Sequence, residues 1–100
     1  MNNDLKEIAE HFGARKQLAK VIEECGELIE AANIYHDDHT IESDPLQAGI
    51  DRLHVIEEMA DVQILIDQLT HLLFAGDELK QMREFKIART KKRIEDKYYA

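Results

Sequence analysis

The chain has 100 residues and a net charge of −8, with 44% hydrophobic and 34% charged residues. This length predicts one small domain over residues 1–100, and the composition is typical of a soluble globular protein rather than a disordered one. The acidic balance argues against general nucleic-acid binding, which needs a basic field, although a bound metal can still recruit phosphate ligands.

The first half of the chain predicts a short helix and then a long one. The short helix covers residues 3–12 and ends at Gly13, and the long helix covers about residues 14–37. The long helix has two apolar stripes, of which one also carries acids. The other stripe needs a partner from this chain or from another subunit. It consists of Leu18, Ile22, Cys25 and Ile29.

The second half of the chain predicts two more helices. A loop that starts at His36 leads to Pro45, which suits the first turn of a helix with Asp44 as its N-cap. This third helix runs to about Phe74, is apolar on most sides and should be the most buried element. After a break with Asp77 as N-cap, the last helix covers about residues 78–98. No strand pattern occurs.

These patterns predict an all-α fold. We expect a short N-terminal helix plus three longer helices, in an antiparallel bundle that is completed by oligomerisation, because so short a helical chain has little interior of its own. The single cysteine, Cys25, excludes a disulfide framework and indicates a reducing, cytoplasmic location. The first residues do not resemble a signal peptide, and no apolar run approaches the ~20 residues that span a membrane.

Two acidic segments are the most informative feature of the sequence, Glu23-Glu24-Cys25-Gly26-Glu27 and Glu57-Glu58-Met59-Ala60-Asp61. Helical periodicity places Glu24 and Glu27 on one face with apolar neighbours, and it does the same for Glu58 and Asp61. Four carboxylates therefore point inward, and buried acids are normally paired with bases or bound to a cation. Carboxylate oxygens favour Mg²⁺, with Mn²⁺ as a possible substitute.

The helix lengths allow the two acid pairs to meet. Glu24 and Glu27 lie roughly 15–20 Å before the end of the long helix. In an antiparallel hairpin, Glu58 and Asp61 reach the same level if the third helix begins near Pro45. The sequence therefore predicts one site rather than two.

The last helix carries eight of the thirteen basic residues. One interpretation is a solvated helix whose bases also suit the dipole at its C-terminal end. The functional interpretation is a basic wall beside phosphates that a metal holds. Other candidates are weaker: the histidine loop with His36 and His39, and His54 on the acid face, which either touches substrate or fills the core. No Walker phosphate loop, dinucleotide fingerprint or Ser-His-Asp pattern occurs.

Glu23, Glu24 and Glu27 on one helix, followed by Glu58 and Asp61 on the next, resemble the signature of the MazG-like all-α nucleoside triphosphate pyrophosphohydrolases. The resemblance covers about residues 14–97 and includes the closing helix with Lys86, Arg89 and Arg93. The separation of Glu27 from Glu58 is slightly long for the family, which we attribute to the loop.

The resemblance implies a hydrolase that converts (deoxy)nucleoside triphosphates to nucleoside monophosphate and pyrophosphate, for house-cleaning of the nucleotide pool. Mg²⁺ would be held by Glu24, Glu27, Glu58 and Asp61. Glu23 would orient or deprotonate the attacking water, and Lys86 and Arg89 would stabilise charge on the phosphates. The family builds its sites in homo-oligomers, and neither motif separates a dimer from a tetramer or selects a base or a sugar.

Two alternatives stay open. The acids can pair with bases such as Lys20 or Arg83 in a non-catalytic helical interaction module, which predicts no thermal stabilisation by Mg²⁺. A metal phosphohydrolase that uses the histidine loop predicts loss of activity when His36 and His39 are replaced, but not when Glu24 is. Glu57 belongs either to the surroundings of the metal or to the surface.

Overall fold

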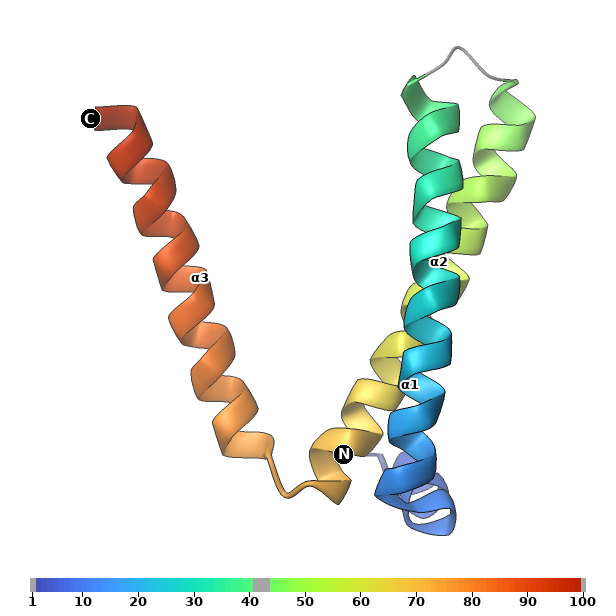
Figure 1. The fold of residues 1–100 in the computed structure, drawn as a ribbon, viewed down its shortest axis with the longest axis vertical. Coiled ribbons are helices and arrows are strands. Elements are labelled where there is room, and N and C mark those ends of the chain that lie inside the picture. Colours follow the sequence, from blue (N-terminus) through green and yellow to red (C-terminus); the bar gives the residue numbers. More distant parts are fainter. Residues whose placement is uncertain (1, 41–43, 100) are drawn as a thin grey trace.

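The computed structural model describes residues 2–40 and 44–99, without the side chains of residues 38–40, 98 and 99. These residues form three helices, α1 (Asn3–Thr40), α2 (Pro45–Leu72) and α3 (Gly76–Tyr99). Figure 1 shows α1 and α2 side by side as an antiparallel hairpin, while α3 diverges from the hairpin. The predicted all-α class is therefore confirmed, but the described residues form three helices instead of a short helix plus three longer ones.

The two helices that the sequence predicts before residue 38 are joined into α1 across a kink at Gly13. Gly13 has φ 83° and ψ 165°, a conformation that is open essentially only to glycine. The kink lets the first helical segment pack against the end of α2. There Ala9 is fully buried, and Glu10 Oε1 lies 3.1 Å from His71 Nε2. Gly13 thus interrupts the helix at the predicted position, and the interruption is a kink within α1.

The start of α2 follows the predicted capping chemistry. Pro45 occupies its first turn, and the Asp44 carboxylate accepts a hydrogen bond of 3.0 Å from the backbone N–H of Leu46. The predicted start of the loop at His36 is wrong, because α1 continues through Thr40. The rest of that loop, residues 41–43, lies outside the described residues.

The boundary between α2 and α3 differs from the prediction by one turn or less. The second helix ends at Leu72, and Phe74 has a positive φ of 52°. The third helix starts at Gly76, so Asp77 lies inside its first turn and is not its N-cap. An acid in this position still interacts favourably with the positive end of the helix dipole.

The core between α1 and α2 is small and half polar. Its buried apolar residues are Ala9, Ala31, Val62, Leu65 and Leu69, and its buried polar residues are Gln17, Glu24, Asp51, Glu58 and Gln68. A hairpin of two helices covers only one stripe of each helix. The other apolar sides of α2 are therefore open, with Leu53 62% and Met59 54% exposed. The prediction that this helix is buried holds for one face only.

The single chain is far from compact. It exposes 8284 Å² of surface, whereas a compact protein of its mass exposes about 5,800 Å². Its radius of gyration is 17.5 Å, against about 13 Å for a compact domain of this length. The excess comes largely from α3, on which every described side chain is exposed. Of the helices described, none combines the length and the hydropathy needed to cross a bilayer.

Candidate metal centre

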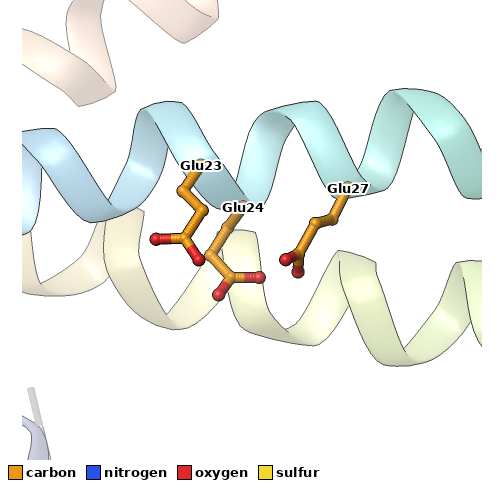
Figure 2. A group of neighbouring side chains, drawn as sticks. All are labelled: Glu23, Glu24 and Glu27. Carbon is orange, nitrogen blue, oxygen red and sulfur yellow. The ribbon is translucent and has the colours of Figure 1, made fainter.

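Two overlapping groups of carboxylates lie where the hairpin brings the acidic segments together. Glu24, Glu58 and Asp61 form one group across α1 and α2, and Glu23, Glu24 and Glu27 form the other along α1. Within each group, one oxygen of every residue lies within 4.8 Å of the others. Figure 2 shows the carboxylates of Glu23, Glu24 and Glu27 extending from the same side of α1. The structure thus joins both predicted acid pairs into one cluster, with Glu24 common to both groups.

Burial divides this cluster into an inner and an outer part. Glu24 and Glu58 are each 8% exposed, and the Oε2 atom of each is buried without a hydrogen-bond partner among the described residues. Asp61 is half-buried, whereas Glu23 and Glu27 are exposed. The sequence predicted that Glu27 points inward like Glu24. It lies instead at the open edge of the hairpin, because two helices cover too narrow a stripe to enclose it.

One lysine and one histidine neighbour the inner carboxylates. Lys20 Nζ lies 3.4 Å from Glu24 Oε1 and 3.5 Å from Glu23 Oε2. Hydrogen bonding to Glu24 and the charge of Glu23 raise the pKa of Lys20, so this side chain stays an ammonium. His54 Nε2 lies 3.4 Å from Glu58 Oε1 on the next turn of α2. His54 therefore contacts the acid cluster and does not fill the core.

The negative charge of the cluster exceeds what these neighbours supply. Five carboxylates face one ammonium group, since His54 is half-exposed and carries charge only when protonated. Hydrogen bonding to Glu24, together with the charges of Glu24, Glu58 and Glu23 and partial burial, raises the pKa of the Glu27 carboxyl. A carboxyl that retains its proton more tightly than usual reports uncompensated negative charge nearby. The cluster therefore carries negative charge that a cation could neutralise.

The predicted phosphate-binding bases do not reach the acids within one chain. Lys86 and Arg89 lie on α3, which contacts α2 near its end and does not contact α1 among the described residues. Both side chains are exposed, and the guanidinium of Arg89 lies 5.7 Å from the ring centre of Phe85. Figure 1 shows α3 leading away from the part of the hairpin that carries the acids.

The remaining candidates lie outside the cluster. Glu57 is exposed and belongs to neither group of acids. His36 is exposed at the far end of α1, with its Nδ1 3.5 Å from Asp37 Oδ1. The side chain of His39 lies outside the described residues, so the histidine-loop hypothesis has no described cluster behind it. Cys25 is a free, half-buried thiol.

Three buried polar residues near the cluster were missed by the sequence interpretation. Gln17 Nε2 donates a hydrogen bond of 2.6 Å to Gln68 Oε1, which links α1 to α2. Asp51 is buried, accepts from Gln47 Nε2 at 3.0 Å, and has a second oxygen without a partner. Their spacing was a usable signal, because each lies seven residues from an acid of the cluster and therefore on the same helix face.

A hollow of about 230 Å³ opens beside the acids, between α1 and α2. Its walls combine acids, amides, one lysine and apolar side chains, namely Gln17, Lys20, Glu24, Asp61, Ile64, Leu65 and Gln68. A ligand that occupied this hollow would touch the carboxylates at one end and the buried amides at the other.

Comparison of this chain with protein-family models, with characterised proteins and with solved structures finds no match. The resemblance to the MazG-like enzymes therefore stays a prediction from the motif residues. The function of the chain is therefore inferred from the geometry and electrostatics of the acid cluster.

Proposed function

We propose that this protein is a Mg²⁺-dependent nucleoside triphosphate pyrophosphohydrolase of the MazG-like type. The observation that carries the proposal is the pair of buried carboxylate oxygens on Glu24 and Glu58 that have no partner among the described residues. A buried carboxylate without a partner costs several kcal/mol, so such oxygens are normally satisfied by a base or a cation. Lys20 pairs with Oε1 of Glu24 and not with Oε2, so we assign a cation to the buried Oε2 atom.

The donor set fits Mg²⁺. All the donors are carboxylates, which suit a hard cation, and opposite ligands of an octahedral Mg²⁺ lie about 4.2 Å apart. The spacing of up to 4.8 Å within each group is close to that value. The residues that we assign to the ion are Glu24, Glu27, Glu58 and Asp61. Mn²⁺ favours the same donors and is expected to substitute.

The remaining residues of the site supply the rest of the chemistry. When bound, the ion neutralises phosphate charge and activates water. Glu23 stands at the exposed edge of the cluster, where its carboxylate can orient the attacking water and accept its proton. The water oxygen bonds to the α-phosphorus, the bond to the bridging oxygen breaks, and pyrophosphate leaves. Lys20 is already held beside the acids and can contact the phosphates.

Lys86 and Arg89 can contact the phosphates only if α3 of a second copy of the chain packs beside the acid cluster. The surface in excess of a compact protein, about 2,400 Å² for one chain, is in the range that obligate oligomers bury. The helix itself exposes apolar side chains that need cover: Met82, Phe85, Ile87 and Ile94. It carries eight basic and five acidic residues, whereas the chain before it carries five basic and sixteen acidic ones, so the two surfaces are complementary in net charge. We therefore propose a homo-oligomer in which α3 packs on the hairpin of another copy.

The test of the activity is pyrophosphate release from a panel of dNTPs with Mg²⁺, comparing wild type with Glu24→Gln and Asp61→Asn. Each substitution retains the shape of the side chain and removes one ligand charge. We expect both variants to lose at least ~100-fold in kcat/KM, in line with the loss of a group that stabilises transition-state charge. Glu30→Gln, an exposed change on α1 outside the cluster, should match wild type. Unchanged rates in both site variants would refute the assignment.

A second candidate function is a non-catalytic helical interaction module. The ion pairs of Lys20 with Glu23 and Glu24 favour it, because they satisfy part of the acid cluster without a metal. This alternative predicts that millimolar Mg²⁺ leaves the melting temperature unchanged. The enzyme hypothesis predicts a rise in melting temperature that follows the occupancy of the site by Mg²⁺.

A further inference from the structure

The amide pair Gln17–Gln68 is the most deeply buried polar contact in the described structure. The two residues are 6% and 3% exposed and lie on facing stripes of α1 and α2. Their hydrogen bond uses one Nε2 proton of Gln17 and the Oε1 atom of Gln68. The Oε1 atom of Gln17 and the Nε2 group of Gln68 remain, and these offer one acceptor beside one donor.

Both glutamines line the hollow next to the acids, and neither of the two remaining atoms is among the fully buried atoms that lack a partner. A pair of glutamines that only fixed the register of the hairpin could be replaced by apolar residues at little cost. A donor and an acceptor that face a lined hollow, with Ile64 and Leu65 as its apolar wall, instead match the composition of ligand pockets.

The separation between the amides and the acids defines the shape of the ligand. Gln17 precedes Glu24 by seven residues and Gln68 follows Asp61 by seven, which is about 10.5 Å of helix rise on both helices. A ligand must therefore present anionic groups at one end and a hydrogen-bonding edge at the other, with a spacer between them. A nucleotide has this layout, with phosphates, a sugar and a base in that order.

We propose that Gln17 and Gln68 form the base-binding end of the site, with the remaining amide oxygen and amide N–H bonded to the edge of a nucleobase. The inference deepens the proposed function and rests on it. The edge of each common base offers a donor next to an acceptor. The amide pair can present its own two groups in either order, because both amides can rotate together. Gln17 and Gln68 can thus bind the edge of any common base without selecting one of them.

The test uses the double variant Gln17→Met/Gln68→Met, which retains unbranched side chains of similar shape and removes both partners at once. The substrates are dTTP and its N3-methyl analogue, which lacks the ring donor. We expect wild type to prefer dTTP over the analogue by ~10-fold or more in kcat/KM, as for one bidentate base contact. In the double variant the ratio should fall to about one.

The matched control is Gln63→Met, the same change at an exposed position of α2, which should retain the wild-type ratio. If the double variant also retains the ratio while pyrophosphate is released normally, the base site is refuted and the proposed function stands. If wild type releases no pyrophosphate from any nucleotide, the proposed function is refuted. In that case, calorimetry in EDTA with dTMP and its N3-methyl analogue as ligands decides the inference. Equal affinity of wild type for the two ligands refutes it. A preference of wild type for dTMP that the double variant loses supports it.

A second variant covers the case in which the double variant loses helicity by circular dichroism. Gln17→Glu retains the length of the side chain and can still accept a hydrogen bond from Gln68, so two acceptors then face the hollow. Guanine offers two adjacent donors, N1–H and the 2-amino group, which match two acceptors. The preference for dGTP over dTTP should therefore rise ~10-fold relative to wild type. An unchanged preference overturns the inference.

Discussion

Replacing Glu24 by glutamine should stabilise the metal-free protein and at the same time abolish its response to Mg²⁺. Glu24 belongs to both groups of carboxylates, and its buried Oε2 atom has no partner in the part of the chain that the structure describes. The substitution retains the shape of the side chain and removes its charge. The new amide can also donate hydrogen bonds to the carboxylates that remain. Without a cation the acids repel one another, so the loss of one charge relieves strain in the fold.

The magnitude follows from the separation of the charges. Oxygens of Glu24 and Glu58 lie within 4.8 Å, which corresponds to roughly 3.5 kcal/mol of repulsion at an effective dielectric constant of about 20. The ion pair with the half-exposed Lys20 is lost as well, and such pairs contribute ~0–1 kcal/mol. The net gain is about 2.5–3.5 kcal/mol, or a rise in melting temperature on the order of 10–28 °C for a chain of this length.

Thermal unfolding in EDTA and in Mg²⁺, at one fixed protein concentration, measures both effects. Wild type should gain about 2.7 kcal/mol when Mg²⁺ is at 100 times its Kd, and Glu24→Gln should gain almost nothing. The melting temperature of Glu24→Gln should therefore exceed that of wild type in EDTA, and in Mg²⁺ the two melting temperatures should converge or change order. Glu30→Gln should melt at the same temperature as wild type in both buffers. A lower melting temperature of Glu24→Gln in EDTA would refute the reasoning, because the acids would then be held by their pairing with Lys20. A retained Mg²⁺ response would show that Glu24 is not a ligand.

Three further predictions concern the backbone, the acid edge and the exposed helix. Gly13→Ala should destabilise the fold by about 1–3 kcal/mol, because φ 83° with ψ 165° is open essentially only to glycine. Gly49→Ala, in the interior of α2 with nothing near the added methyl group, should instead stabilise it by about 0.5–1 kcal/mol, and denaturant unfolding distinguishes the two. The raised pKa of Glu27 means that this group stabilises the fold fully below its ordinary pKa of 4.5, and that this contribution is lost as the pH rises through the raised value. In EDTA, wild type should therefore gain stability on acidification from pH 7 relative to Glu27→Gln, and parallel pH profiles would contradict this. Phe85→Glu should lower the mass measured by light scattering towards that of a monomer, since Phe85 is 61% exposed on α3 in the single chain, and a monomeric wild type would remove the basis for this expectation.

Local chemistry made the elements predictable, and geometry across the hairpin made the site predictable. Asp44 and Pro45 marked the start of α2 because capping depends on neighbouring residues only. Glu24 and Glu58 could be brought to one level because helix rise is constant, and the register followed from the position of the loop. The exposure of Glu27 was not predictable in this way. Helical periodicity gives the direction of a side chain but not the width of the partner that covers it.

The glutamine pair shows a different limit. A rule that assigns glutamine to the surface passes over Gln17 and Gln68, although both repeat the heptad positions of the acids. A polar residue at a buried helical position has to be read with its partner on the facing helix, and that pairing needs the register of the hairpin. Asp51 accepts its hydrogen bond from Gln47 on the same helix, so the signal for its burial was its position seven residues before Glu58.

The position of α3 connects the fold with the proposed function. Its sequence pattern predicts a helix as clearly as the patterns of α1 and α2 do, so its formation was predictable. Its position in the fold depends on a surface that one chain does not supply. A helix whose apolar and basic residues are all exposed lacks the tertiary contacts from which helices in proteins gain most of their stability. The negatively charged acid cluster can pair with the bases of α3, and the exposed apolar sides of α2 can cover its apolar residues. If α3 binds there in a second copy, its bases enter the acid site and its apolar residues are covered in the same step. Catalytic competence and assembly would then depend on one contact, so a change such as Phe85→Glu should reduce pyrophosphate release even though Phe85 lies outside the acid cluster.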